Sequence, residues 1–340
     1  MAAKAHVPIP CPSHPTYSVE KVIQAALQED AGDRGDVTTL STVPAETQAT
    51  ATFLAKADGV LAGLGVADQV LQAVDPSVKV EWHARDGDRV TRGSVLGSMR
   101  GSARSILVAE RIMLNFMQRM SGIATATAAM VTALDGLPTR VLETRKTAPG
   151  LRVLDKWAVL IGGGANHRMG LYDMMMIKDN HIAAAGGIRA AVQRAEEYIR
   201  AHGLADMCVE VETRTLEEVD EVVEILRGAA AAARKETEQG AGEAEAQAEA
   251  EAAARRCHVT RVMLDNMARR DAAKEGGVDV SMLAEAVARL AGLGVETEAS
   301  GNVALDTIRP IAATGVTFVS VGGLTHSVTA LDISLNIETQ

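Results

Sequence analysis

Aromatic side chains are scarce in this sequence. Phe, Tyr and Trp make up only 2% of the 340 residues, whereas hydrophobic residues of all kinds make up 47%. Material for a buried core is therefore ample, but that core has to be built from Val, Ile, Leu, Met and Ala. The length exceeds that of a typical single domain and suits two domains.

Cysteine is also scarce, and long apolar runs are missing. Cys11, Cys208 and Cys257 are too far apart along the chain to suggest a disulfide framework or a zinc-binding pattern. The start of the sequence contains prolines and lacks the apolar core of a signal peptide. No stretch reaches the roughly 18 uninterrupted apolar residues that a membrane helix needs. We therefore expect a cytoplasmic protein that does not interact with membranes.

Positive charge is in short supply as well. The formal net charge of −10 argues against a general surface for nucleic acid or for anionic membranes. Yet His167, Arg168 and Lys178 fall within twelve residues of one another, in the stretch GGGANHRMGLYDMMMIKDNH. A cluster of basic groups in an acidic protein indicates an anionic ligand that binds at this point of the chain.

The first 100 residues predict a small α+β unit. Residues 18–30 have Ser18 as a candidate N-cap, followed by apolar residues at helical spacing. The segments 49–64 and 78–101 are typical of short strands separated by Asp-Gly turns. A long helix is predicted to follow over residues 104–134.

Along that long helix, six apolar residues are predicted to form one buried stripe. Its members share the helical period and are Ile106, Ala109, Met113, Phe116, Met120 and Ile123. Arg111 lies about 140° around the helix from Ile106, given the 3.6-residue period. We therefore expect Arg111 to point at solvent, at a ligand or at another subunit.

From residue 140 onward the pattern alternates between short apolar runs and helical stretches. The apolar runs are 140–144, 174–177, 207–212, 261–266, 295–300 and 317–323, and each ends in polar residues or glycine. The helical stretches between them include 186–201, 214–227, 281–292 and 304–313. This alternation predicts a parallel α/β barrel, in which the active site lies at the C-terminal ends of the strands.

One segment does not fit the barrel pattern. Residues 228–256 are rich in Ala and Glu and contain no Val, Ile, Leu, Met or aromatic residue. Such a segment has nothing to anchor it in a core, although Ala and Glu favour helix. We predict a surface insertion, either an extended helix or a disordered arm, without chemistry of its own.

Polar groups at the predicted strand ends form three sets. The basic set consists of Arg111, Arg145, Lys146, His167, Arg168 and Lys178. The acidic set consists of Glu210, Glu212, Asp265 and Glu298. The glycine set, Ser300-Gly301 and Gly322-Gly323, follows the last two strands, where barrels commonly bind phosphate.

Each set suits a different part of one substrate. Basic side chains bind carboxylates or pyrophosphate, and carboxylates hold Mg²⁺ or ribose hydroxyls. Backbone N–H groups of glycine-rich turns bind phosphate. The three sets together predict a strongly anionic, phosphorylated substrate that also carries carboxylates.

Each group by itself has a simpler interpretation. His167 could be structural, Arg168 a surface residue and Asp265 a helix N-cap, and the glycine pairs could be ordinary turns. Glu210 and Glu212 alternate with valines and should face the same way. If they face the barrel interior, at least one must meet a cation, because an unpaired buried carboxylate is costly. The recurrence of polar groups at successive strand ends favours a shared site.

The sequence resembles the quinolinate phosphoribosyltransferases, or carboxylating nicotinate-nucleotide pyrophosphorylases, in six segments. In order these are ERIMLNFMQRMSGIATAT, ETRKTAPGLRVLDKWAVLIGGGANHRMGLYDMMMIKDNH, VEVETRTLEE, VMLDN, EASGN and VGGLTHSVTALDISL. Apart from the Ala/Glu-rich insertion, the resemblance runs from about residue 27 to the last residue. It implies a type II phosphoribosyltransferase-like α/β fold. An N-terminal open sandwich (1–125, joined by 325–340) would precede an incomplete parallel α/β barrel (126–324) that carries the active site.

The resemblance also implies a reaction, a metal and an assembly. Quinolinate would react with phosphoribosyl pyrophosphate, with Mg²⁺ as cofactor, to give nicotinate mononucleotide, pyrophosphate and CO₂ for NAD synthesis. The enzyme would be a homodimer or an assembly of dimers, in which the N-terminal domain of one subunit completes the site of the next. Neither a covalent enzyme intermediate nor a redox cofactor is expected.

The resemblance assigns roles to individual residues. Those expected at the quinolinate carboxylates are Arg145, Thr147, His167, Arg168 and Lys178, with Arg111 donated across the dimer. Those expected to be catalytic are Lys146, near the leaving pyrophosphate, and Glu212 and Asp265, which would also hold ribose hydroxyls and Mg²⁺, directly or through water or substrate. Those expected in the phosphate-binding loops are Ser300, Gly301, Asn302, Gly322, Gly323 and His326. The glycines at 162–164 are expected only to make a turn.

Three other functions stay open at this point. A related phosphoribosyltransferase acting on another pyridine or pyrimidine acid, or a paralogue with a role in metal uptake, would share the fold. A barrel lyase or aldolase would use Lys146 or Lys178 to form a Schiff base. A binding protein would keep the pocket without turnover.

Overall fold

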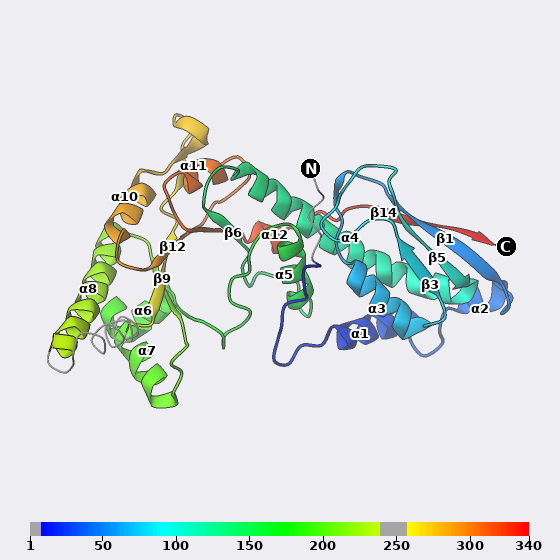
Figure 1. Cartoon of the computed structure of the whole chain (residues 1–340), viewed down its shortest axis with the longest axis horizontal. Helices are drawn as coiled ribbons and strands as arrows, with labels where there is room; N and C mark the ends of the chain where they lie inside the picture. The colour runs from blue at the N-terminus through cyan, green and yellow to red at the C-terminus, as the bar shows by residue number, and fades with distance from the viewer. Residues whose placement is uncertain (1–7, 239–256, 340) are drawn as a thin grey trace. The chain divides into compact units, whose positions relative to one another are not determined.

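The computed structural model describes residues 8–238 and 257–339. Two compact units can be distinguished in it (Figure 1). Unit 1 consists of Met1–Thr132, Glu143–His167 and Gly322–Gln340. Unit 2 consists of Ala133–Leu142 and Arg168–Val321.

Unit 1 is built on an antiparallel sheet. In sheet order its strands are β14 (Ile333–Thr339), β1 (Gln48–Ala55), β5 (Val95–Ser102) and β3 (Lys79–Trp82). Every second side chain of β1, from Ala49 to Ala55, is buried, as the two-residue period of a strand requires. Strands β2 (Gly59–Val60) and β4 (Arg89–Val90) pair with each other in a separate, two-stranded antiparallel sheet. The pairing of β14 with β1 confirms that the last residues return to the N-terminal domain.

Six helices of the described chain belong to unit 1 together with this sheet. They are α1 (Val19–Ala31), α2 (Val37–Thr42), α3 (Leu64–Val74), α4 (Ala103–Ala133), α5 (Arg152–Ile161) and α12 (Gly323–His326). Ser18 caps α1 by accepting a hydrogen bond from the backbone N–H of Lys21, as predicted. All six residues of the predicted α4 stripe are at most 7% exposed, and Arg111 is exposed, so both predictions are confirmed. Helices α2, α3, α5 and α12 were not predicted.

Helix α5 explains why unit 1 includes residues 143–167. Its apolar residues Leu154, Trp157 and Val159 belong to the same buried cluster as α4 and the sheet. A Cβ atom at Gly162 would lie 2.5 Å from the Ala124 carbonyl oxygen of α4, so glycine permits this close packing. Unit 1 therefore includes residues 143–167, whereas the prediction placed all of 126–324 in the barrel domain.

Unit 2 contains six parallel strands, as predicted. In sheet order they are β6 (Arg140–Leu142), β13 (Phe318–Ser320), β12 (Glu296–Ser300), β9 (Val259–Asp265), β8 (Val209–Thr213) and β7 (Met175–Ile177). Within the described ranges the outer strands β6 and β7 do not pair with each other, so the barrel is incomplete. The fold is therefore an open α/β sandwich with an incomplete parallel α/β barrel.

Helices follow the barrel strands along the chain. They are α6 (Asp179–Ala185), α7 (Ile188–His202), α8 (Leu216–Glu238), α10 (Ser281–Leu290) and α11 (Ile308–Ala312). Helices α7, α8 and α10 lie side by side next to the sheet (Figure 1). A short ribbon of β10 (Arg269–Arg270) and β11 (Val278–Asp279) flanks the turn η1 (Glu275–Gly277). Helix α6 was not predicted.

The predicted insertion begins as a continuation of α8. This helix extends to Glu238, and the side chains of 228–232 are exposed or partly exposed, which agrees with an extended surface helix. Residues 239–256 of the predicted insertion lie outside the described residues. Among the described helices, none combines the length and apolar character needed to cross a membrane.

Candidate functional site

The predicted site residues are divided between the two units. Unit 1 carries Arg111, Arg145, Lys146, Thr147, His167, Gly322, Gly323 and His326. Unit 2 carries Arg168, Lys178, Glu212, Asp265, Ser300, Gly301 and Asn302. Several of these residues directly follow barrel strands: β7 ends before Lys178 and β9 ends at Asp265. The prediction of polar groups at strand ends is thereby confirmed.

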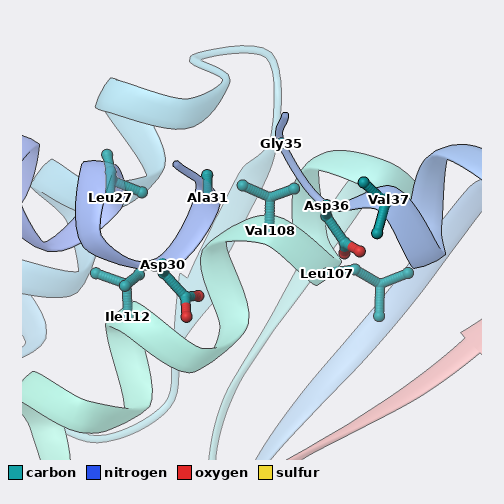
Figure 2. Close-up of a pocket in the computed structure, with 9 residues that line it drawn as sticks. All are labelled: Leu27, Asp30, Ala31, Gly35, Asp36, Val37, Leu107, Val108 and Ile112. Atoms are coloured by element: carbon teal, nitrogen blue, oxygen red, sulfur yellow. The ribbon is translucent and has the colours of Figure 1, made fainter. Parts of the chain in front are cut away.

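Arg111 is exposed on α4, and other residues of this helix line a cavity of unit 1 (Figure 2). The cavity is formed by the end of α1, the loop before α2 and the first half of α4. Its lining residues are Leu27, Asp30, Ala31, Gly35, Asp36, Val37, Leu107, Val108 and Ile112. None of these lining residues was predicted to bind substrate.

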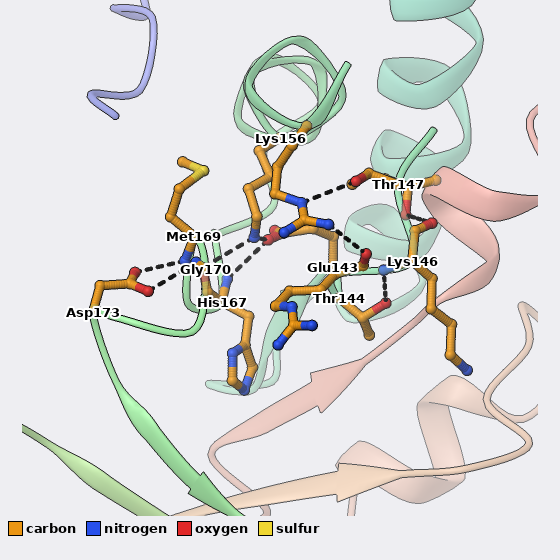
Figure 3. A network of polar contacts seen from close by, with 12 residues as sticks. Glu143, Thr144, Lys146, Thr147, Lys156, His167, Met169, Gly170 and Asp173 are labelled. Atoms are coloured by element: carbon orange, nitrogen blue, oxygen red, sulfur yellow. Dashed lines mark hydrogen bonds and ion pairs between the residues drawn. The ribbon is translucent and has the colours of Figure 1, made fainter. Parts of the chain in front are cut away.

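A fully buried ion pair anchors the two unit 1 loops that carry basic site residues (Figure 3). Glu143 and Lys156 are both 0% exposed and form a salt bridge. Lys156 Nζ also donates to the carbonyl oxygen of His167, at 3.0 Å. The backbone N–H of His167 in turn donates to the Glu143 carboxylate, at 3.1 Å. The segment after β6 and the segment that ends at His167 are therefore fixed to each other.

Asn166 completes this network. With its amide oriented so that both atoms find partners, its nitrogen donates to the Lys156 carbonyl oxygen (3.0 Å) and to Glu143 Oε2 (3.1 Å). Buried charges need such partners, because an uncompensated one is costly. Neither Glu143 nor Lys156 was among the predicted site residues, although a lysine within the apolar run LDKWAVLI is a detectable signal.

A second arginine holds the segment that carries Arg145 and Thr147. Arg152 Nε donates to Thr147 Oγ1 (3.0 Å), and its Nη2 donates to the Arg145 carbonyl oxygen (3.1 Å). Arg145 is itself half-buried, and its Nε has no hydrogen-bond partner among the residues that the structure describes. A buried donor without an acceptor is costly, so an oxygen atom of an anionic ligand would be a favourable partner here.

Lys146 lies beside the glycine turn that follows β13. The Thr325 hydroxyl donates to the Lys146 carbonyl oxygen, at 2.9 Å. A Cβ atom at Gly322 would lie 3.0 Å from Lys146 Cδ and 3.3 Å from His326 Cδ2. The predicted pyrophosphate-side lysine and two predicted phosphate-loop residues are therefore neighbours within unit 1.

In unit 2 three carboxylates gather around Arg214, which was not among the predicted site residues. Arg214 Nη2 lies 2.8 Å from Asp179 Oδ2 and 3.0 Å from Glu212 Oε1, and its Nε lies 3.5 Å from Asp265 Oδ2. Lys178 Nζ is 3.9 Å from Glu212 Oε2. The sequence signal was present, because Arg214 follows the end of β8 like the other polar residues at strand ends. Asp265 ends a strand and precedes no helix, so its interpretation as an N-cap was wrong.

Burial and neighbouring charges act in opposite directions on the pKa of Glu212. Burial raises the pKa of the Glu212 carboxyl, and the negative charge of Asp265 raises it further. The positive charges of Lys178 and Arg214 act in the opposite direction and lower that pKa. The ionised form of Glu212 therefore depends on the cations beside it.

The other two acidic candidates lie deeper in the sheet. Glu210 and Glu298 are both 0% exposed. Arg261 Nη1 lies 3.3 Å from Glu298 Oε2, and Arg261 also interacts electrostatically with Glu210. The Arg261 guanidinium stacks 4.2 Å from the centre of the Phe318 ring. The expectation that the buried carboxylates meet cations is confirmed, although Arg261 itself was not predicted.

The glycine loop after β12 packs against the end of β9. The backbone N–H of Asn266 donates to the Ser300 carbonyl oxygen, at 2.8 Å. Gly301 has a φ of 92°, and a Cβ atom there would lie 2.2 Å from Asn266 Oδ1. Asn302 also has a positive φ, of 56°. Only glycine suits position 301, and the predicted phosphate loop lies next to the acidic residues of unit 2.

The segment after His167 forms a closed turn (Figure 3). The Asp173 carboxylate accepts hydrogen bonds from the backbone N–H groups of Met169 (2.6 Å) and Gly170 (2.8 Å). Arg168 is half-buried, and its Nη1 donates to the Met174 carbonyl oxygen at 3.1 Å. Arg168 is therefore held in place and is not a freely mobile surface residue.

Comparison with known proteins gives consistent matches over the whole chain. Residues 123–336 match the family described as quinolinate phosphoribosyl transferase, C-terminal domain, and residues 36–121 match its N-terminal domain. The chain is 53% identical over 339 residues to a carboxylating nicotinate-nucleotide pyrophosphorylase of Arabidopsis thaliana, covering 100% of this chain and 88% of that protein. It is 52% identical over 340 residues to the enzyme of the same name from Oryza sativa subsp. japonica, covering 100% and 83%.

A solved structure of the same family is also similar to this chain. The crystal structure of nicotinate-nucleotide pyrophosphorylase from Ehrlichia chaffeensis superposes with a TM-score of 0.77 at 32% identity. The match covers 95% of this chain and 100% of that one.

Proposed function

Because the chain belongs to the quinolinate phosphoribosyltransferase family, we propose that it transfers the phosphoribosyl group of phosphoribosyl pyrophosphate to quinolinate. Loss of CO₂ then gives nicotinate mononucleotide and pyrophosphate, a step of de novo NAD synthesis. The observation that carries this proposal is the match to both family domains, with 52–53% identity to plant relatives along the chain.

The basic residues are assigned to quinolinate. Its two carboxylates need several cationic partners, and the candidates are Arg145, His167, Arg168 and Lys178, with the Thr147 hydroxyl as an additional donor. The buried Nε of Arg145 supports this assignment, because a carboxylate oxygen would supply the acceptor that it lacks among the described residues. The anchoring of His167 by Glu143 and Lys156 supports it too, because a positioned binding group loses less entropy when the ligand binds.

The reaction needs positioning and charge stabilisation more than covalent chemistry. The pyridine nitrogen attacks C1 of the ribose while pyrophosphate leaves, and positive charge develops on the ribose. Glu212 and Asp265 would stabilise that charge, and Lys146 would neutralise the departing pyrophosphate. The ribosylated ring then accepts the electron pair of the breaking C–C bond as CO₂ departs, and a proton from water takes the place of the lost carboxylate at that ring carbon. Ser300, Gly301, Asn302, Gly322, Gly323 and His326 would hold phosphate groups.

Mg²⁺ belongs to the same proposal. Carboxylate oxygens are the ligands that Mg²⁺ prefers, and Glu212 and Asp265 already share one cationic group, the Arg214 guanidinium. The donor set of unit 2 therefore fits a metal ion, held directly or through water or substrate. When bound, Mg²⁺ would help to neutralise the phosphate oxygens of the substrate.

The proposed assembly is a homodimer, or a group of dimers, in which Arg111 acts in the site of the neighbouring subunit. Its exposure on α4 supports this role. Arg111→Ala and Lys146→Ala should each be nearly inactive. After the two variants are unfolded and refolded together, mixed dimers should regain activity, because one of their two sites is intact. Absence of any recovery would contradict a site shared between subunits.

The cytoplasmic location is also part of the proposal and is supported by the widely spaced free cysteines. Both plant relatives are named as chloroplastic. Microscopy of the tagged full-length protein in its own cells decides between the two compartments.

One assay tests the function directly. The protein is incubated with quinolinate, phosphoribosyl pyrophosphate and Mg²⁺, and nicotinate mononucleotide, pyrophosphate and CO₂ are measured. We expect equal amounts of the three products, and no nucleotide when nicotinate replaces quinolinate. Turnover of nicotinate or another ring acid would instead indicate a related transferase, and tight quinolinate binding without products would indicate a binding protein. Borohydride trapping of a carbonyl substrate on Lys146 or Lys178 would indicate a Schiff-base enzyme.

A further inference from the structure

Arg214 occupies the centre of the acidic residues in unit 2, yet it is not a buried residue. Its side chain is 47% exposed, whereas those of Glu212 and Asp265 are only 6% and 14% exposed. The backbone N–H of Arg214 donates to the Glu218 carboxylate at 2.6 Å, which fixes the start of the side chain next to α8. The arginine therefore combines a fixed backbone with a guanidinium group that solvent can reach.

The contacts of Arg214 differ in their accessibility. Glu212 and Asp265 lie inward, but the third partner, Asp179, is 40% exposed and lies only 2.8 Å from Nη2. Asp179 can therefore keep the guanidinium at the rim after its contacts with the two inner carboxylates are broken. The inner carboxylates that pair with Arg214, those of Glu212 and Asp265, are also the groups proposed to hold a divalent metal. A carboxylate cannot serve both cations at full strength.

We propose that Arg214 is a built-in counter-cation that occupies the acidic site until a divalent metal replaces it. While no metal is bound, Arg214 compensates the charges of Glu212 and Asp265. When the metal enters, the guanidinium moves outward and stays paired with Asp179. This inference rests on the proposed function in so far as that function supplies the metal.

The exchange has a consequence for the order of binding. A metal ion that enters alone displaces Arg214 from Glu212 and Asp265, and the guanidinium gains no new partner in exchange because it only keeps Asp179. A metal bound to a polyphosphate brings phosphate oxygens, which are strong acceptors for arginine. Arg214 thus weakens binding of the free metal and favours entry of the metal together with its anionic substrate.

Metal binding without substrate tests the proposal. Mn²⁺ is titrated into the full-length protein, and free Mn²⁺ is measured by electron paramagnetic resonance. We expect Arg214→Ala and Arg214→Gln to bind Mn²⁺ at least about fivefold more tightly than the wild type, the size of a modest coupling between two sites. Arg214→Lys keeps the charge and should stay close to the wild type.

The matched control is Arg189→Ala. Arg189 is also exposed and paired with a glutamate, Glu224, but it lies on α7 and contacts no proposed metal ligand. It should leave Mn²⁺ affinity unchanged. The proposal is overturned if the neutral Arg214 variants bind Mn²⁺ no more tightly than the wild type, or if Arg214→Lys binds as tightly as Arg214→Ala. Because no turnover is measured, absence of transferase activity would refute the proposed function without altering this result.

Discussion

Two sets of ion pairs, one from each unit, differ in their access to water. Glu143 and Lys156 in unit 1 are fully buried, whereas Arg214 in unit 2 is half exposed while its partners Glu212 and Asp265 are not. A buried pair cannot change partners without leaving an uncompensated charge in the interior. A half-exposed arginine can exchange one partner for another, because water screens the intermediate state. The first arrangement fixes loop geometry, and the second permits exchange with a ligand.

Breaking the buried pair should have the largest effect on stability. Lys156→Met leaves the Glu143 charge without its partner, and we expect a loss of about 3–5 kcal/mol in the free energy of unfolding. Arg214→Met should cost less, because the arginine is half exposed and Lys178 remains beside Glu212. Urea unfolding measures both. The double variant Glu143→Leu/Lys156→Met should be more stable than Lys156→Met. If the two single variants lose equal stability, the comparison between the units fails.

Lys146→Ala should have the largest effect on turnover. Lys146 is expected to neutralise charge that appears as pyrophosphate leaves, so its loss should lower kcat by about 10²–10³-fold. Quinolinate affinity should change little, because the lysine is assigned to the other substrate. Steady-state kinetics separates the two effects. A variant with normal kcat and a raised KM for quinolinate would place Lys146 among the quinolinate-binding residues instead.

Arg168→Ala should act mainly on quinolinate binding. Loss of a charged hydrogen bond to a carboxylate costs about 1.5–3 kcal/mol, so the dissociation constant should rise about 10-fold or more. Calorimetric titration of quinolinate measures the change. Arg189→Ala removes an exposed arginine away from the site residues and is the control. An unchanged quinolinate affinity in Arg168→Ala would refute its assignment.

Substitution by alanine should reduce stability more at Gly301, in the loop after β12, than at a glycine in an open turn. Gly301→Ala places a methyl group against Asn266 at a positive φ, so we expect a loss of about 1–3 kcal/mol in stability. Gly292 also has a positive φ, of 75°, but nothing lies within 4 Å of a Cβ atom added there. Gly292→Ala therefore introduces backbone strain without a steric clash. Thermal unfolding should therefore show a smaller loss for Gly292→Ala. Equal losses would mean that the packing against Asn266 is unimportant.

The smallest expected effect concerns pH. Burial, aided by the charges of Cys11 and Asp155, raises the pKa of Tyr17 from 10.0 to about 12. Because the folded pKa is the higher one, Tyr17 contributes stability that is complete below pH 10 and is lost as the pH rises to about 12. Tyr17→Phe should therefore show a weaker loss of stability between these pH values. Urea unfolding at pH 9 and about pH 11 gives the free energy of unfolding at each pH. An equal loss of that free energy in both proteins would contradict the prediction.

Local patterns were enough to predict much of the fold. The buried stripe of α4, the Ser18 cap and the six barrel strands all follow from periodicities within short segments. The predicted positions of Lys178, Glu212 and Asp265 at strand ends followed from the same alternation. Helices α2, α3, α5, α6 and α12 were missed. Helix α2 follows a glycine-rich turn, α3 lies among short strands, and the other three are short or lie within segments rich in polar residues.

The sequence by itself determined which residues are charged, which faces are apolar and where the strands end, because these properties depend on neighbours along the chain. Only the tertiary structure decided which charges meet. Glu143 and Lys156 are thirteen residues apart along the chain, and Arg214 meets carboxylates from three separate segments. The strength and exchangeability of an ion pair depend on its burial and on its partners, and both arise only when distant segments pack together.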